Sequence, residues 1–594
     1  MLNSLLRLKP FVRPYRLRLA SGIASFGFAR VFEALVPFFL ATGIDKVAGG
    51  DGDVTNQVFG IVAAVAGRYV FVTYARYSVR SVGMRVAFDL RGALYDALQK
   101  QGSGFFSTHT IGDMMTRAVA DISLVQRLIS MGSILLIILV YASIVGFGFM
   151  LYYSPALTLL LLPPLPVVYY YARHASRQMG VASKDTQDRL SDLGAQVQEN
   201  LSGIRTIQAM AQEDNEIARF ARTSQAYADA FYRQARINSL MMAWMPSLAA
   251  LCSITIVGFG GYLVLSGEMS PGALVAFLMY VNMVVQPFRV AGFMVNLFQR
   301  AAVASDRLFE VLSLEPEIED LPGADAPARV RGVLETRNLS FRYGDGLPLA
   351  LDGISLSIGR GESIAVMGRV GSGKTTLLRQ FVRLLDPPPG QVFLDGQDIR
   401  DYPLAQLRAQ TALVPQVTFL FSETLRDNLT YDDPGREIDS IWAAAEAADL
   451  KETIEGFPDG MDTVVGERGV TLSGGQVQRA TLARGLIRDA PVLLLDDCFS
   501  SVDTETEERI LKDLRRLRRG KTTVVVSHRV STARHCDRIL VLDAGRIIES
   551  GTHEELIRQD GLYVEFERIQ REGAGESDYR GAASPLAFAE RAVE

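Results

Sequence analysis

The sequence predicts an all-α polytopic membrane domain followed by an α/β domain. Long apolar runs fill the first half, a segment rich in proline and acid follows near residue 315, and short β-like runs then alternate with helical segments. With 594 residues, of which 48% are hydrophobic, the chain exceeds the size of a single hydrophobic core. We therefore expect at least two domains.

Six apolar segments are long enough to cross a bilayer core of about 30 Å. They cover residues 18–44, 55–79, 132–153, 155–172, 238–266 and 272–298. Charges and prolines interrupt the opening "MLNSLLRLKPFVRPYRLRL", so it predicts an amphipathic surface helix, not a signal peptide. These spans define the predicted membrane domain, 1–314.

Arginine and lysine flank the spans asymmetrically. They cluster before the first span and after the second, whereas the short links 49–53, 152–155 and 266–271 contain neither residue. The positive-inside rule then places both termini in the cytoplasm. We expect the membrane to be the inner (cytoplasmic) membrane of the cell. The two long links, about 80–130 and 173–236, also face the cytoplasm and should continue the spans as helices.

Three ionisable residues, Arg30, Glu33 and Arg68, lie within predicted spans. Such residues by default suggest a cavity or a functional pathway. Arg30 and Glu33 are also three apart on one helix face, so they could simply pair. The sequence leaves both interpretations open.

Charge and cysteine content exclude some functions. A formal charge of −5 argues against nucleic-acid binding. The three scattered cysteines, Cys252, Cys498 and Cys536, suggest neither a disulfide framework nor a zinc site.

Beyond a predicted linker at 315–332, the segment 333–570 should form the α/β domain, with a tail at 571–594. In "SIAVMGRVGSGKTTLLRQF" (363–381) an apolar strand enters a glycine-rich loop and then a helix, the pattern of a P-loop. Its expected nucleotide-binding residues are Gly368, Arg369, Val370, Gly371, Ser372, Gly373, Lys374, Thr375 and Thr376. Lys374 should reach the β and γ phosphates of a bound nucleotide, and the Thr375 hydroxyl should bind Mg²⁺.

A second apolar strand, "PVLLLDD" (491–497), ends in two carboxylates. In a P-loop site Asp496 would hold Mg²⁺ through water. The order of further motifs around these two strands makes a family recognisable.

"LSGGQVQR" (472–479) lies between the loop and the Asp strand and resembles the signature sequence of ATP-binding cassette (ABC) proteins. The resemblance implies that Leu472, Ser473, Gly474, Gly475 and Gln476 complete the ATP site of a partner subunit. It also implies that Tyr343 stacks on adenine, that Gln416 senses Mg²⁺ and water, and that His528 contacts the γ-phosphate. Ser500, Ser501 and Asp503 match the loop that crosses the dimer interface, and "GERG" (466–469) matches the loop that touches the membrane domain.

The resemblance extends into the membrane half. Segments 105–122 and 199–220 look like the two intracellular loops of six-helix exporters, with coupling helices expected near 107–112 and 212–216. About residues 15–570 resemble one half of a type IV ABC exporter.

The family pattern has glutamate after the Mg²⁺ aspartate, as general base, whereas this chain has Asp497. Its carboxylate is withdrawn by one C–C bond, about 1.5 Å, and misplacement by about 1 Å can cost on the order of 10²-fold in rate. An intact signature beside a weakened base is similar to one subunit of a heterodimeric exporter, whose partner supplies a true glutamate.

The sequence thus favours an exporter of a drug-like compound, a lipid or a peptide, embedded in a lipid bilayer and binding no nucleic acid. One alternative is an ATP-binding regulatory or gating membrane protein that hydrolyses little ATP. A homodimeric exporter is another. An importer is disfavoured, because importers usually keep cassette and membrane domains on separate chains.

Overall fold

The computed structural model describes residues 2–573 except 51, 162, 163, 290, 326, 328, 329, 345, 467, 468, 470 and 471. The chain divides into two compact units. Unit 1 contains Met1–Leu98 and Ile111–Leu314, and unit 2 contains Gln99–Thr110 and Glu315–Glu594. The predicted tail, 571–594, lies almost wholly outside the described residues. The predicted domain limits stay predictions.

The described residues of unit 1 form helices joined by short turns, with no strand among them, as predicted. Its helices are α1 (Leu2–Leu6), α2 (Lys9–Val12), α3 (Arg16–Ala48), α4 (Thr55–Gln99), α6 (Ile111–Thr116), α7 (Ile122–Arg127), α8 (Ser133–Tyr153), α9 (Pro155–Leu160), α10 (Pro164–Ser202), α11 (Ile204–Ala209), α12 (Glu213–Leu265), α13 (Pro271–Arg289) and α14 (Ala291–Leu312). A 3₁₀ turn, η1 (Arg13–Tyr15), precedes α3, and two π-helical turns, η2 (Arg117–Asp121) and η3 (Leu128–Gly132), flank α7.

Three helical stretches are long and apolar enough to cross a membrane: Lys9–Ala48, Thr55–Gln99 and Ile111–Tyr153. They contain the first three predicted spans. Shorter apolar helices cover Ser253–Leu265 and Pro271–Val285. The predicted span 155–172 is divided between α9 and α10, and 272–298 between α13 and α14. The count of six spans is therefore not confirmed and stays a prediction.

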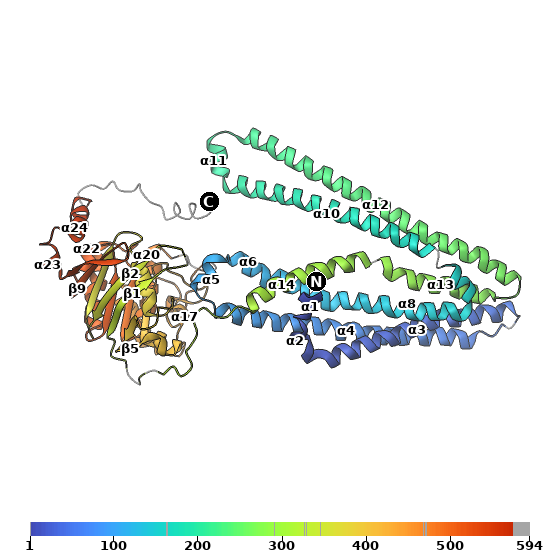
Figure 1. Ribbon diagram of the computed structural model, residues 1–594, viewed down its shortest axis with the longest axis horizontal. Helices are drawn as coiled ribbons and strands as arrows, with labels where there is room; N and C mark the ends of the chain where they lie inside the picture. Colours follow the sequence, from blue (N-terminus) through green and yellow to red (C-terminus); the bar gives the residue numbers. More distant parts are fainter. Residues whose placement is uncertain are drawn as a thin grey trace. The chain divides into compact units, whose positions relative to one another are not determined.

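The helices extend well past any membrane, as the charged links predicted. α4 has 45 residues, α10 has 39 and α12 has 53. At 1.5 Å per residue, α12 is about 80 Å long, against about 30 Å for a bilayer core. α10 and α12 lie side by side (Figure 1), and Arg233 on α12 donates to Asp185 on α10 at 2.6 Å.

Hydrogen bonds fix how the apolar helices of unit 1 pack. The Tyr280 hydroxyl on α13 donates to the Ala34 carbonyl on α3 at 2.7 Å. At the far end of α3, Asp45 accepts bonds from the Ser270 hydroxyl and the Gly272 N–H at 2.6 and 2.7 Å. A Cβ at Gly272 would lie 2.1 Å from the Ala41 carbonyl oxygen, so only glycine allows this approach.

The ionisable residues of the predicted spans form a triad. Arg30 pairs with Glu33, and Arg68 on α4 reaches the other oxygen of the same carboxylate at 3.6 Å. The triad joins α3 to α4. The structure confirms that these residues pair, and a role in a pathway stays a prediction.

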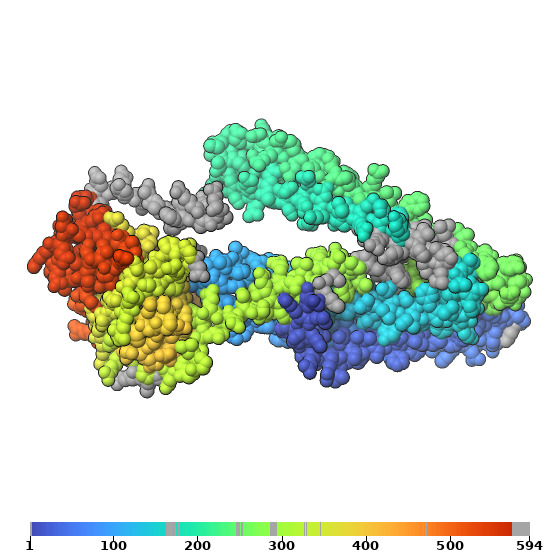
Figure 2. Space-filling view, in the orientation of Figure 1, coloured from blue at the N-terminus to red at the C-terminus, as the bar shows by residue number. Residues whose placement is uncertain are grey.

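A second ion network holds the end of α14. Arg117 is 5% exposed and donates to Asp113 at 2.9 Å and to Glu310 at 2.8 Å. Beside it, α1 packs on α14 (Figure 2), where the Ser305 hydroxyl donates to the Ser4 carbonyl at 2.9 Å. The opening segment therefore forms two short helices, of which α1 is docked on unit 1.

Unit 2 is built on two sheets, which Figure 1 shows surrounded by helices. The smaller has the order β2-β1-β4-β5 and is antiparallel, with β1 (Leu334–Phe341), β2 (Leu351–Ile358), β4 (Val392–Leu394) and β5 (Gln397–Asp398). The larger has the order β10-β9-β3-β8-β7-β6, with β3 (Ser363–Gly368), β6 (Thr411–Val414), β7 (Val492–Asp496), β8 (Thr522–Val526), β9 (Arg538–Asp543) and β10 (Arg546–Gly551).

All strands of the larger sheet except β10 run parallel. Every residue of β7 and β8 is buried, as expected for parallel strands covered on both faces. The helices of unit 2 that follow β3 in the chain are α15 (Lys374–Phe381), α16 (Leu404–Gln410), α17 (Leu425–Leu429), α18 (Ile438–Ala447), α19 (Lys451–Glu455), α20 (Gly474–Leu486), α21 (Thr504–Leu517), α22 (Val530–Ala533), α23 (His553–Leu556) and α24 (Leu562–Gly573). Short 3₁₀ turns are η4 (Ile399–Asp401) and η5 (Gly460–Asp462).

Candidate functional site

The carboxyl ends of β3, β6, β7 and β8 meet at one edge of the larger sheet. β3 passes directly into the loop 369–373, whose last residue caps α15. Gly373 has φ +100°, and a Cβ there would lie 2.5 Å from the Ala350 carbonyl oxygen. Gly368 would bring a Cβ within 2.1 Å of the Leu542 carbonyl oxygen. The loop can therefore follow this path only with glycine at both positions.

Lys374 curls back into this loop. Its Nζ donates to the Gly368 and Arg369 carbonyls, both at 2.8 Å, and to the Ser372 hydroxyl at 3.4 Å. Burial lowers the pKa of the ammonium, while the nearby Asp497 and Asp496 oppose that shift. A positive charge is thus held beside backbone N–H groups and a helix N-terminus, an arrangement suited to phosphate.

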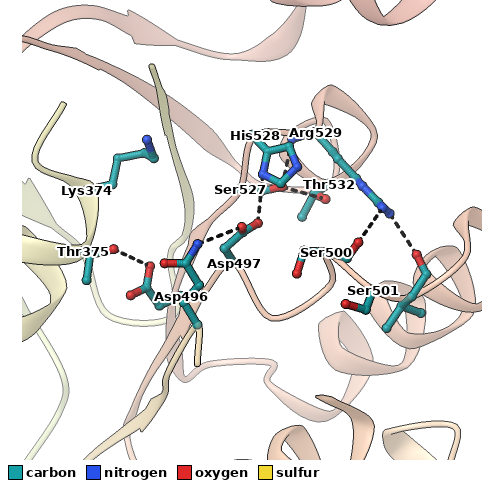
Figure 3. Close-up of polar contacts among 12 residues, drawn as sticks. Lys374, Thr375, Asp496, Asp497, Ser500, Ser501, Ser527, His528, Arg529 and Thr532 are labelled. Carbon is teal, nitrogen blue, oxygen red and sulfur yellow. Dashed lines mark hydrogen bonds and ion pairs between the residues drawn. The ribbon is translucent and has the colours of Figure 1, made fainter. Parts of the chain in front are cut away.

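Asp496 ends β7 next to this loop. Its carboxylate is 4% exposed and accepts a hydrogen bond from the Thr375 hydroxyl at 3.0 Å (Figure 3). Desolvation raises its pKa, and the Thr375 bond opposes that shift. The carboxylate and hydroxyl oxygens, with the amide of Gln416 nearby, form the hard oxygen donor set that Mg²⁺ prefers.

Asp497 stands between two other predicted residues. Its Oδ1 lies 3.0 Å from His528 Nδ1, and its Oδ2 accepts from Gln416 Nε2 at 3.3 Å (Figure 3). The backbone turns sharply here, with φ +46°, which directs the carboxylate away from that of Asp496. The structure therefore brings Gln416, Asp497 and His528 together from three separate segments of the chain.

Tyr343 lies beside α15. Its hydroxyl is 2.9 Å from the Thr376 hydroxyl, and its ring packs edge-on against Phe341. The side chain is 53% exposed, so one face of the ring is free to stack on a planar group.

The signature segment forms the start of α20. Ser473 and Gln476 make a reciprocal capping box, which satisfies the first backbone N–H groups of the helix. Gln478, one turn on, donates to the Ser500 hydroxyl and accepts from the Ser501 N–H, both at 2.8 Å. Asp503 caps α21 by accepting from the Thr506 N–H at 2.9 Å. The signature and the predicted interface loop are thus one connected structure.

Sequence reasoning missed the residues that hold this loop. Glu507 is 1% exposed and accepts from the Arg529 guanidinium and the Thr532 hydroxyl. Arg529 also donates to the Val502 and Ser500 carbonyls at 3.1 and 3.3 Å. Only the position of Arg529 directly after His528 could have drawn attention to it.

We expect Glu507→Ala to unfold unit 2 more easily. Removing one partner of a buried ion pair lowers the free energy of unfolding by about 3–5 kcal/mol. We expect the lower value, about 3 kcal/mol, because the Arg529 side chain is 27% exposed. For a domain of this size that lowers the midpoint of thermal unfolding by about 8 °C. Glu508→Ala is the matched control, because Glu508 is 62% exposed and lies 3.8 Å from Arg534. Equal shifts in both variants would contradict a special role for the buried pair.

Two expectations about short helices need correction. The first helix between the long segments is α5 (Ser103–Thr108), not 107–112, and it belongs to unit 2. There its Gly104 N–H donates to Glu317 at 3.3 Å, and Ser103 donates to the Leu384 carbonyl at 3.4 Å. The second short helix is α11 (Ile204–Ala209), not 212–216, because the long helix α12 already begins at Glu213. Of "GERG", Glu467 and Arg468 lie outside the described residues.

Comparison with known proteins gives this architecture a class. The family model "ABC transporter transmembrane region" matches residues 19–288, and "ABC transporter" matches 351–500. The fold and site therefore define a membrane-embedded, ATPase-coupled transporter. The chain belongs to the ABC transporter family.

Similar proteins match this chain over most of their own length. The uncharacterized ABC transporter ATP-binding protein YknU of Bacillus subtilis is 32% identical, over 95% of this chain and 97% of that protein. An ATP-dependent lipid A-core flippase of Syntrophus aciditrophicus is 36% identical over 82% of this chain and 81% of its own. A putative multidrug export protein of B. subtilis, YgaD, is 31% identical over 95% and 99%. A solved bacterial Atm1-family ABC exporter with ATP bound is 27% identical, with a TM-score of 0.74 over 97% of this chain and 99% of that one.

Proposed function

We propose that this chain is one half of an ATP-driven exporter in a bacterial cytoplasmic membrane, with both termini in the cytoplasm. Its cargo is a hydrophobic or amphipathic molecule, by analogy with relatives named for lipid A-core and multidrug export. The observation that carries the proposal is the meeting of five side chains at one sheet edge: Lys374, Asp496 at the end of β7, Asp497 directly after it, Gln416 and His528.

In this proposal the loop 368–374 binds the phosphates of ATP through backbone N–H groups and the Lys374 ammonium. Thr375, Asp496 and Gln416 hold Mg²⁺, which neutralises phosphate charge when it is bound. Tyr343 stacks on adenine. Asp497 orients and deprotonates the attacking water, and His528 holds the γ-phosphate.

We further propose that the chain works as a heterodimer. Asp497 is one bond shorter than the glutamate of the family pattern, so the site built on Lys374 hydrolyses ATP slowly. The chain's own signature, Leu472 to Gln476, completes the partner's site and is well formed by its capping box. The partner then supplies a glutamate, and hydrolysis occurs mainly there. Movement of the cassettes reaches the spans through α5 and the α11 region.

The test is transport in vesicles. The purified chain, alone and with a glutamate-bearing half-transporter, is reconstituted with its cassette outside, and uptake of an amphipathic dye or a fluorescent lipid is followed. We expect uptake that requires ATP and is lost when Lys374→Met is introduced. Normal ATP binding without movement would instead identify a regulatory protein, and movement out of these vesicles would identify an importer.

A further inference from the structure

A groove in unit 1 runs along α4 and is walled by arginine. Its volume is about 950 Å³. Five arginines line it, Arg18 from α3 and four from α4: Arg68, Arg76, Arg80 and Arg85. None of the described residues that line it is acidic. The groove is therefore strongly positive and suited to an anion.

Helical spacing places most of this charge in one row. Arg68, Arg76 and Arg80 are separated by multiples of four residues, so they lie on the same face of α4. The neighbouring row, at residues 65, 69 and 77, contributes Val65, Tyr69 and Tyr77 to the wall. The groove thus joins a cationic strip to an apolar one, which suits an amphipathic ligand.

Contacts within the chain restrain three of these arginines. Arg68 pairs with Glu33 at 3.6 Å. Arg18 lies over the Tyr77 ring at 5.5 Å, and Arg85 over the Tyr15 ring at 5.7 Å. These contacts hold the groove wall in place.

Arg76 and Arg80 differ from the others. Both are exposed, and no ion pair joins either to a carboxylate within the described part of the chain. Like charges four residues apart on a helix repel. A bound anion between them would relieve that repulsion.

The expected depth of the groove in the membrane indicates which kind of anion binds there. The predicted span covers residues 55–79, and α4 continues to Gln99. In the proposed orientation, Arg76 to Arg85 lie at the headgroup level of the cytoplasmic leaflet, where basic residues attract anionic lipid. Val65 and Tyr69 lie about two to three helical turns deeper, at the level of the acyl chains.

We infer that this groove binds an anionic phospholipid of the cytoplasmic leaflet. The headgroup phosphate lies between Arg76 and Arg80, and one acyl chain follows Val65 and Tyr69. The inference rests on the proposed membrane orientation but not on export activity. The positive-inside rule explains these arginines only by the orientation of the chain in the membrane, whereas the inference gives them a ligand.

The experiment titrates the detergent-solubilised full chain with phosphatidylglycerol or phosphatidylcholine and counts bound lipids by native mass spectrometry. We expect phosphatidylglycerol to bind at least about tenfold more tightly than phosphatidylcholine. The double variant Arg76→Gln, Arg80→Gln should bind phosphatidylglycerol about thirtyfold more weakly, which is the usual contribution of two basic residues. Its affinity for phosphatidylcholine should not change. ATPase activity is not needed for this readout, so a failed transport assay would not affect it.

The matched control is Arg91→Gln with Arg222→Gln, which removes the same charge from exposed positions outside the groove. This pair should retain phosphatidylglycerol binding, and Arg76→Lys with Arg80→Lys should retain most of it. Equal affinity for both lipids in the unmodified chain, or equal loss in the control pair, would overturn the inference. Displacement of the lipid by glycerol phosphate alone would also overturn it, since a free phosphate would then suffice.

Discussion

Replacing Asp497 by glutamate is expected to raise the ATP turnover of the purified chain by about 10²-fold. The aspartate carboxylate is already engaged by His528 and Gln416, at 3.0 and 3.3 Å. Glutamate at the same position would advance the carboxylate by about 1.5 Å toward the site of the attacking water. The measurement is steady-state phosphate release at saturating Mg²⁺ and ATP, for the unmodified chain and for Asp497→Glu.

Asp497→Asn serves as the control, because asparagine keeps the length of aspartate but cannot accept a proton. We expect it to lower whatever turnover the unmodified chain has. Brisk hydrolysis by the unmodified chain, with no gain in Asp497→Glu, would show that aspartate suffices as the base. The heterodimer proposal would then fail, and the chain would be a homodimeric exporter with an unusual acid.

Lys374→Met is expected to weaken ATP binding at the site built on Lys374 by about 10²-fold and to abolish hydrolysis at that site. A hydrogen bond to a charged group contributes about 1.5–3 kcal/mol, and about 3 kcal/mol corresponds to this loss. Methionine matches the lysine side chain up to Cε and lacks only the ammonium, so the loop need not collapse. Binding of a fluorescent ATP analogue, measured without hydrolysis, reports the affinity directly.

Arg369→Gln provides a matched control within the same loop. The Arg369 side chain is 59% exposed and points to Glu565 at 3.3 Å, while its backbone carbonyl contacts Lys374. If only the loop backbone and Lys374 bind phosphate, this variant should keep its affinity within about twofold, as for a surface ion pair. A loss as large as that of Lys374→Met would mean that net charge, and not the position of the ammonium, attracts ATP.

Local sequence patterns predicted much of this protein. The strand–loop–helix order around Lys374 and the apolar run ending at Asp496 describe the observed β3, α15 and β7, because each pattern depends on neighbouring residues only. The two classes of domain and the first three spans followed from hydropathy in the same way. Coupling helices were misplaced by several residues, since helix ends depend on caps and packing that no local pattern contains.

The family resemblance assigned Gln416, Asp497 and His528 to one site, but only the tertiary structure decided which distant side chains are in contact. Gln416, Asp497 and His528 converge because parallel strands end at a common edge, and strand order cannot be read from periodicity. The same holds for the ion pair of Glu507 with Arg529, since Glu507 is buried only once α21 and α22 pack together. The arginine groove on α4 depends likewise on how α3 contributes Arg18. Sequence determined the elements and their chemistry, whereas burial and strand order, which are long-range properties, determined the contacts.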